Sequence, residues 1–171
     1  SRLRAAGGAG AILAGGRGRR MGGVQKALEP LAGRPLLQHV IDRMQPQADA
    51  LVLSTDRHRQ EYDEFGLEQV PDLKPDAGPL CGLASVLARS ADAWDWVLLA
   101  PCDAPFVPRD LGRRLHDAAE QAQATVAVVR YGSRLQPVFS IWHACLHDDV
   151  RQAVSERGMS GFRQFLEARD H

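Results

Sequence analysis

Short apolar runs alternate along the chain with stretches in which apolar residues recur at helical spacing. Runs of a few apolar residues bounded by turn residues are typical of buried strands. Such runs cover residues 9–14, 50–54, 96–100, 125–129 and 137–142, with a shorter one at 68–70. We therefore expect each of these segments to form a strand, the last of them beginning at Pro137.

Helical periodicity appears in the segments between the predicted strands. Pro35, Pro79 and Pro108 each precede residues that place apolar side chains on one face of a helix. Proline is favoured in the first turn of a helix. We expect helices beginning near these three prolines and two further helices that carry Val150 and Phe165.

Strands that alternate with helices predict a largely parallel sheet covered by helices on both faces. The predicted fold class is α/β, a Rossmann-like three-layer sandwich. Residues 1–8 are expected to be a flexible N-terminal tail and residues 9–171 one domain. Ligands bind such sheets beyond the carboxyl ends of the strands, so we expect the site in the loops after residues 14, 54, 70 and 100.

Composition narrows the class of protein without identifying it. Apolar residues make up 44% of the 171 residues and charged residues 25%, as in an ordinary globular domain. The 21 basic and 21 acidic residues balance, so we expect no binding to nucleic acid or membrane. Cys81, Cys102 and Cys145 form no CxxC pair, which predicts neither disulfides nor a zinc site and favours the reducing cytoplasm.

The loop after the first predicted strand is rich in glycine and arginine. It reads LAGGRGRRMGG at residues 13–23, and Lys26 follows it. Glycines allow backbone N–H groups to approach an anion closely, and the basic side chains can form charge-assisted hydrogen bonds to phosphate oxygens. One interpretation is a cradle for a triphosphate. The alternative is a flexible surface loop with solvated arginines.

Two other phosphate-binding loops can be compared with this segment. A P-loop needs Gly-Lys followed by Ser or Thr, but Lys26 stands between Gln25 and Ala27. A dinucleotide-binding fingerprint needs the spacing GxGxxG. Gly16 and Gly18 fit its first two positions and Met21 occupies the third. With Asp56 as the acid that binds ribose, a dinucleotide-dependent oxidoreductase stays open as a rival hypothesis.

Several motifs in order resemble the molybdenum cofactor guanylyltransferase family. LAGG at 13–16, RMGG at 20–23 and KAL at 26–28 are similar to that family's pattern LAGGxxxRMGGxDKxL. GPLCG at 78–82 resembles its GPLxG turn, PCDAP at 101–105 its PCDxP metal loop, and QPVFSIW at 136–142 its HPVxxLW strand. The resemblance extends from about residue 9 to about residue 167.

The resemblance implies that GMP is transferred from GTP to the terminal phosphate of molybdopterin, with magnesium as cofactor and release of pyrophosphate. It implies that Lys26 and Arg20 neutralise the phosphates and that Asp103 binds the metal. The nucleotide contacts that it implies, together with the backbone of the glycine loop, fall on Leu13, Ala14, Gly15, Gly16, Lys26, Ser54, Asp72 and Asp103. The expected protein partners are cofactor-biosynthesis or molybdoenzyme-maturation proteins.

Other roles for these residues stay open at this point. From position alone, Asp103 also fits a turn or cap before Pro105, and Asp72 fits a simple turn residue. Cys102 is expected to be a buried filler, since no base is evident beside it. Candidates for the pterin side of the site are Trp142 and two arginines, Arg130 and Arg134.

Three departures from the family's pattern leave alternatives open. Gln25 stands where the family has Asp, and Ser54 stands where it has Asn. The family continues into a strand and a helix with an NxNTPxDL-like segment, whose Asn is expected to help hold the metal, and the sequence up to His171 lacks it. A cytidylyltransferase on the same acceptor and a non-catalytic nucleotide-binding protein that handles the cofactor are the alternatives.

Overall fold

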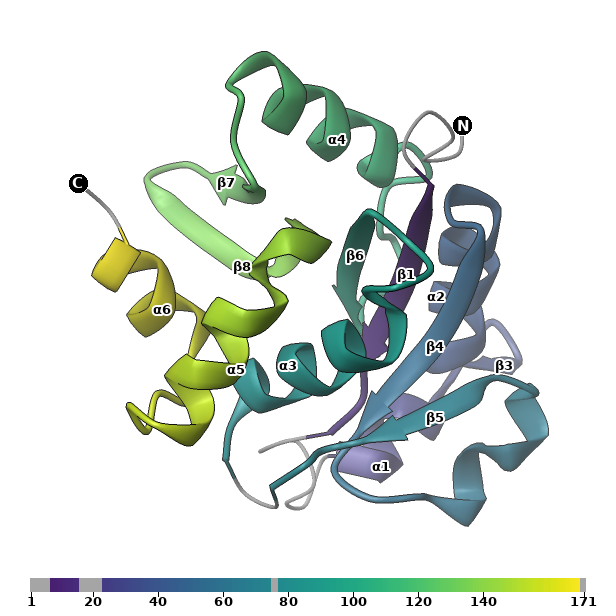
Figure 1. The fold of residues 1–171 in the computed structure, drawn as a ribbon. Helices are drawn as coiled ribbons and strands as arrows, with labels where there is room; N and C mark the ends of the chain where they lie inside the picture. Colours follow the sequence, from purple (N-terminus) through teal and green to yellow (C-terminus); the bar gives the residue numbers. More distant parts are fainter. Residues whose placement is uncertain (1–6, 16–22, 75–76, 170–171) are drawn as a thin grey trace.

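A six-stranded sheet forms the centre of the computed structural model of the chain (Figure 1). The structure describes residues 7–15, 23–74 and 77–169, with residues 23–25 described by their backbone alone. In chain order the strands of this sheet are β1 (Gly8–Leu13), β4 (Ala50–Thr55), β5 (Glu68–Pro71), β6 (Trp96–Pro101), β7 (Val126–Tyr131) and β8 (Arg134–His143). Their spatial order is β5-β4-β1-β6-β8-β7.

Most of this sheet is parallel, as the alternation of strands and helices predicts. β1 pairs in parallel with β4 and β6, and β4 pairs in parallel with β5. The antiparallel pairs are β6 with β8 and β8 with β7. Because two antiparallel steps restore the direction, β7 runs the same way as β6.

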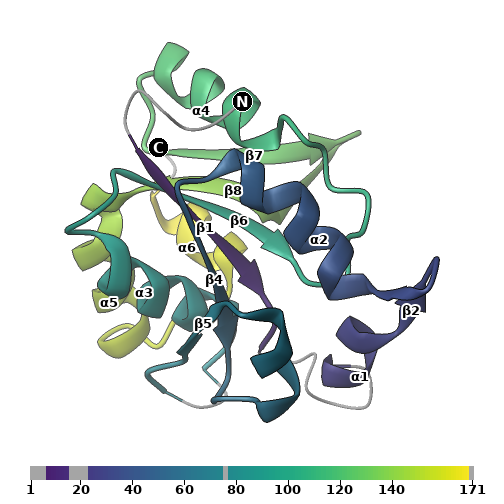
Figure 2. The same cartoon turned by 90° about the vertical axis from the view of Figure 1, so that its right-hand side faces the viewer.

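Helices cover both faces of the sheet, which gives a Rossmann-like three-layer α/β sandwich (Figures 1 and 2). One face carries α2 (Leu36–Met44) and α4 (Leu111–Gln121). The other carries α3 (Pro79–Ser90), α5 (His147–Ser155) and α6 (Phe162–Arg169). Shorter elements are α1 (Gly23–Leu28), the β2–β3 hairpin (Pro30–Leu31 and Arg34–Pro35) and the 3-10 turns η2 (Gln45–Gln47), η3 (Gln60–Phe65) and η4 (Ala144–Leu146).

The central strands are buried on both faces, which explains why they appear in the sequence as continuous apolar runs. Along β6, Leu98 packs with the helices α2 and α4, whereas Val97 and Leu99 pack with α3, α5 and α6. Side chains of successive strand residues point to opposite faces, so each strand supplies both cores. None of the helices within the described ranges is long and apolar enough to cross a lipid bilayer.

The direction in which the chain adds strands reverses beside β1. From β1 the chain passes to β4 and then to β5, and α3 then carries it back to β6 on the other side of β1. Such a reversal separates the loops that follow the two neighbouring strands and leaves a crevice at their carboxyl ends. The fold therefore places a potential ligand site above β1.

Two predicted boundaries are wrong, and both involve proline. Helix α4 begins at Leu111 and not at Pro108, because Gly112 N, which would donate to the carbonyl of Pro108 in a longer helix, donates to Gln47 Oε1 at 2.7 Å instead. Strand β8 begins at Arg134 and not at Pro137. Pro137 lies where the pairing of β7 and β8 shifts register, which accommodates its missing N–H donor.

The buried side chain of Gln47 connects η2 to the start of α4. Its Nε2 donates to the carbonyls of Arg43 at 2.9 Å and Pro108 at 2.8 Å, and its Oε1 accepts from Gly112 N at 2.7 Å. We expect Gln47→Leu to lower the free energy of unfolding by about 2 kcal/mol, because it leaves a buried N–H without an acceptor. Urea unfolding measures this loss. The exposed neighbour Gln45→Leu is the control, and an equal effect of both variants would contradict the assignment.

Candidate nucleotide site

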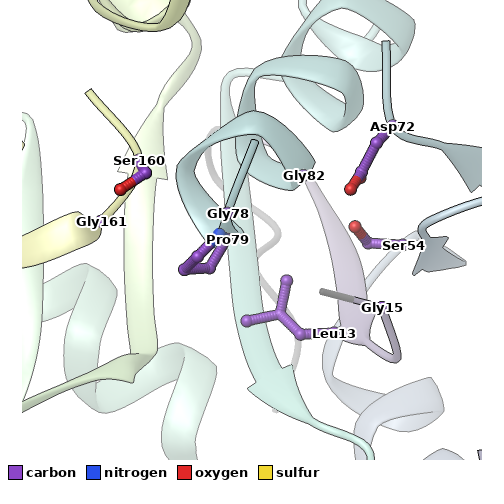
Figure 3. Close-up of a pocket in the computed structure, with 9 residues that line it drawn as sticks. All are labelled: Leu13, Gly15, Ser54, Asp72, Gly78, Pro79, Gly82, Ser160 and Gly161. Atoms are coloured by element: carbon purple, nitrogen blue, oxygen red, sulfur yellow. The ribbon is translucent and has the colours of Figure 1, made fainter. Parts of the chain in front are cut away.

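A cavity of about 360 Å³ opens at the carboxyl ends of the parallel strands (Figure 3). It lies where the strand pattern predicts a ligand site, beside β1 and the ends of β4 and β5. Its walls come from strand ends, from the start of α3 and from the connection between α5 and α6. The residues that line it are Leu13, Gly15, Ser54, Asp72, Gly78, Pro79, Gly82, Ser160 and Gly161.

Hydrogen bonds between neighbouring loops hold the strand ends of this cavity in register. Ala14 N donates to the carbonyl of Ser54 at 2.8 Å, and Asp72 N donates to the carbonyl of Thr55 at 2.8 Å. The parallel pairing thus continues past the ends of β1 and β5. As a result, Ser54 and Asp72 lie next to each other on one side of the cavity, as Figure 3 shows.

Glycine is required at two positions of the cavity because other chain segments approach it closely. A Cβ at Gly15 would lie 2.5 Å from the backbone nitrogen of Asp56, closer than any real contact. A Cβ at Gly82 would lie 2.8 Å from Ser54 Oγ and 3.5 Å from Asp72 Oδ1. Gly82 therefore leaves open the space in front of the two polar side chains.

The connection between α5 and α6 reaches the cavity through a backbone contact with α3. Gly78 has φ +90°, and its Cβ would lie 2.5 Å from the carbonyl oxygen of Ser160. The same oxygen accepts a hydrogen bond from Leu80 N at 3.0 Å. Sequence reasoning did not identify Ser160 or Gly161 as site residues, because this contact joins segments far apart in the chain. The Gly-Met-Ser-Gly run at 158–161 signals only a loop.

Asp72 has an altered acidity in this position. Burial raises its pKa to about 6, and the nearby negative charge of Asp56 adds to this effect. Its carboxyl group is therefore protonated in mildly acidic solution and ionised at neutral pH. An ionised carboxylate beside the hydroxyl of Ser54 suits a ligand that presents hydrogen-bond donors.

Asp56 is engaged in a strong ion pair. Arg59 donates to it from Nε at 3.1 Å and from Nη2 at 2.7 Å, and the two side chains are only 14% and 13% exposed. Burial alone would raise the pKa of Asp56, but the hydrogen bonds and positive charge of Arg59, together with hydrogen bonds from the backbone, lower it overall. A carboxylate held this way is not available as the ribose-binding acid of a dinucleotide fold, which argues against the oxidoreductase hypothesis.

Lys26 and Asp103 form an ion pair beside the cavity's first strand. Lys26 Nζ lies 3.5 Å from Asp103 Oδ2, and their side chains are 57% and 37% exposed. Such an exposed pair contributes at most about 1 kcal/mol to stability. The pair brings together a cation from α1 and an anion from the turn after β6. Asp103 caps no helix in the described structure.

The structure also separates other candidates from the site. The side chain of Trp142 is fully buried and its Nε1 donates to Ser140 Oγ at 2.8 Å; its prediction as a pterin contact is therefore wrong. Burial raises the pKa of Cys102 to about 12, so its thiol is not ionised. Cys102 is therefore a space-filling residue, as expected. Gly16 and Arg20 lie outside the described residues.

Comparison with known proteins identifies the family. Residues 10–171 match the MobA-like NTP transferase domain. The chain belongs to this family. It is 39% identical over 149 residues to a molybdenum cofactor guanylyltransferase of Nitrobacter hamburgensis, covering 85% of this chain and 71% of the relative. A protein of the same name from Cupriavidus necator is 44% identical over 155 residues, covering 87% of this chain and 77% of the relative.

A solved structure shows that the fold is shared. Molybdopterin-guanine dinucleotide biosynthesis protein A from Archaeoglobus fulgidus superimposes with a TM-score of 0.74 at 22% identity, covering 94% of this chain and 79% of the other. Membership of the MobA-like NTP transferase family makes this chain a nucleotidyltransferase. For such an enzyme the crevice above β1 is the expected place of the nucleotide, and the cavity between Asp72 and Gly15 lies there.

The two cavity glycines of this nucleotidyltransferase should respond differently to substitution. In Gly15→Ala the new methyl group meets backbone atoms that cannot move aside, so we expect a loss of stability of about 2 kcal/mol. In Gly82→Ala it meets the Ser54 hydroxyl, which can rotate away, so we expect near-normal stability with a smaller cavity and weaker nucleotide binding. Thermal unfolding and nucleotide titration measure the two effects. Equal destabilisation by both variants would contradict this difference.

Proposed function

We propose that this protein transfers GMP from GTP to the terminal phosphate of molybdopterin, forming a guanine dinucleotide cofactor and releasing pyrophosphate. The observation that carries the proposal is the arrangement of polar groups along the carboxyl edge of the sheet. A cavity with Asp72 and Ser54 on one side adjoins Gly15, and the Lys26–Asp103 pair lies beside it. The relatives named molybdenum cofactor guanylyltransferase support the same activity.

Asp72 and Ser54 suit the guanine base. Guanine presents a ring N–H and an amino group as neighbouring donors, and an ionised carboxylate accepts two such hydrogen bonds. Because Gly82 has no side chain, the base can approach both residues. Ser54 adds a hydroxyl that donates or accepts. Cytosine has no ring N–H to donate, so the carboxylate favours GTP over CTP.

The turn after β1 suits the triphosphate. Leu13, Ala14 and Gly15 lead from the end of β1 into this turn, and Gly15 allows the backbone to lie against the next loop. Lys26 supplies a compact positive charge. We assign the N–H of Gly16 and the guanidinium of Arg20 to the same phosphates, on the basis of their place in the glycine-rich segment.

Asp103 suits a magnesium ion that arrives with the nucleotide. No three His, Cys, Asp or Glu side chains are grouped as metal ligands anywhere in the described ranges. One carboxylate next to a triphosphate nevertheless fits magnesium, which prefers one or two carboxylates together with phosphate oxygens and waters. When bound, magnesium would neutralise phosphate charge that develops during transfer. Lys26, now paired with Asp103, would then turn to the phosphates.

The chemistry asks the protein for positioning and for charge neutralisation. An oxygen of the acceptor phosphate attacks the α-phosphorus of GTP, a new P–O bond forms, and the bond to the β-phosphate breaks, so that pyrophosphate leaves with its negative charge. Such reactions depend on aligned reactants more than on covalent help from side chains. Lys26 and Arg20 stabilise the leaving group by charge-assisted hydrogen bonds, and the base contacts fix the nucleotide along the sheet edge.

We place this activity in the cytoplasm, because all three cysteines are free thiols and free thiols persist in reducing compartments. The protein partners that we propose are those that deliver molybdopterin or receive the dinucleotide cofactor during molybdoenzyme maturation. A balanced net charge gives no reason to add nucleic acid or membrane to this set.

Pyrophosphate release tests the proposal directly. With molybdopterin and magnesium present, we expect turnover with GTP to exceed turnover with CTP by at least about tenfold. Asp103→Asn should lower turnover on the order of 100-fold or more, since it removes the carboxylate that holds the metal. The control is Asp92→Asn, in the exposed turn after α3, which should behave as wild type. A preference for CTP would overturn the base assignment, and GTP binding without pyrophosphate release would favour a non-catalytic nucleotide-binding protein.

The raised pKa of Asp72 predicts a pH dependence of GTP binding. The carboxylate that accepts from guanine is lost as pH falls through about 6. Between about pH 7.5 and about pH 5, the loss of this carboxylate should therefore raise the dissociation constant of GTP for wild type about tenfold. Asp72→Asn should bind GTP weakly at the higher pH and lack this rise. The GTP phosphates also change ionisation over this range, but they affect both proteins equally. Comparing the dissociation constants of wild type and Asp72→Asn at each pH therefore isolates the contribution of Asp72. The same slope in both would show that Asp72 is not the group responsible.

A further inference from the structure

The spatial order of the strands determines the order in which the proposed ligand-binding residues lie along the carboxyl edge of the sheet. The carboxyl ends of β5, β4, β1 and β6 are neighbours in that sequence, and they present Asp72, Ser54, Gly15 and Asp103. Neighbouring strands are about 4.8 Å apart, so the distance from β5 to β6 is comparable to the length of a nucleoside triphosphate. With the base at Asp72 and the phosphates between Gly15 and Asp103, the next place along the edge is the start of β8.

The start of β8 extends past the end of its pairing with β6. The β6–β8 pairing ends at Leu99 and Ser140, whereas β8 begins at Arg134 and there pairs with β7 alone. Because β7 runs in the same direction as β6, the β7–β8 hairpin turns at the edge where Asp103 lies. In Figure 2 the arrowheads of β6 and β7 point to the same side of the molecule.

An irregularity in β8 separates this extension from the rest of the strand. Val128 pairs with Ser140, but the next residue, Val129, pairs with Gln136. Residues 137–139 therefore form a bulge, and Ser140 Oγ closes it by donating to the carbonyl of Pro137 at 2.6 Å. Bulges redirect strands and often lie next to active sites. This one directly precedes Ser140, the first residue of β8 that pairs with β6.

The side of the sheet on which the extension presents its side chains follows from the pairing. Val129 packs with the core that lies under α2 and α4, and Gln136, directly opposite it, faces the same side. Arg134 faces that side too, two residues before Gln136, and so does its partner Tyr131. Ala27 of α1 belongs to the same core, so α1, the helix that carries Lys26, lies on that side of the sheet as well.

Two of these side chains are exposed in a way that the fold itself does not explain. Tyr131 is 82% exposed. Arg134 is exposed and pairs with no acid in the described part of the chain, while arginines such as Arg89 and Arg169 do pair with one. A free guanidinium binds phosphate and also stacks on flat rings, and an exposed tyrosine ring offers a second stacking surface.

We propose that Tyr131, Arg134 and Gln136 bind the acceptor substrate of the reaction. The acceptor carries a phosphate and a flat heteroaromatic ring, and these residues lie next along the edge from the phosphates of the nucleotide. Arg134 supplies the positive charge, Tyr131 the stacking surface and Gln136 an amide for hydrogen bonds. The assignment of this acceptor as molybdopterin rests on the proposed function.

Direct binding of molybdopterin without nucleotide tests this assignment separately from transfer. Quenching of pterin fluorescence gives the acceptor affinity, and a GTP titration gives the nucleotide affinity. We expect Arg134→Ala to weaken acceptor binding about tenfold or more, since it removes a charge-assisted contact, and to leave GTP binding within about twofold of wild type. Arg134→Lys should recover part of the loss, and Tyr131→Ala should weaken acceptor binding as well.

Arg114→Ala is the matched control. Arg114 is an exposed arginine of α4. In the same helix, His116 contacts Trp96 at the start of β6. This part of α4 therefore lies toward the edge of the sheet opposite the carboxyl ends of the parallel strands. Wild-type acceptor affinity in both Arg134→Ala and Tyr131→Ala would overturn the assignment, as would an equal loss in Arg114→Ala. If molybdopterin binding depends on Arg134 but no guanine dinucleotide forms, the acceptor site stands and the proposed transfer fails.

Discussion

The close approach of two loops at Gly15 is the constraint on which the site depends. No Cβ fits between this residue and the backbone of Asp56, and Ala14 N bonds to the carbonyl of Ser54 at the same point. The turn after β1 is therefore held against the end of β4. Because β1 also borders the reversal of strand order, this contact fixes one wall of the crevice.

Three aspartates near this crevice have different electrostatic environments, and their differences suit different tasks. Burial raises the pKa of Asp72, whereas Arg59 lowers that of Asp56 despite its burial. Asp103 is more exposed and lies 3.5 Å from Lys26 Nζ. A carboxylate fixed by an arginine organises a loop, one in a cavity selects a ligand's donors, and one beside an exposed cation can exchange that partner for a metal and its phosphates.

The sequence predicts the strands and the position of the site better than it predicts the site's walls. Apolar runs such as residues 96–100 reveal buried strands because both of their faces are covered. Pro108 and Pro137 were misinterpreted since distant hydrogen bonds and a register shift decide their roles. Ser160 was missed because it reaches the cavity through a backbone contact with Leu80. Periodicity within one segment carries no information on such contacts.

The serine at position 54 illustrates how a departure from a family's pattern can be compatible with its site. The backbone of Ser54 keeps its structural role, since its carbonyl accepts from Ala14 N whatever the side chain is. Its hydroxyl lies 2.8 Å from the place that a Cβ of Gly82 would take, so positions 54 and 82 share one volume. A longer asparagine would extend further into that volume. The serine thus leaves a wider space in front of Asp72, and the carboxylate becomes the principal polar group that a base meets there.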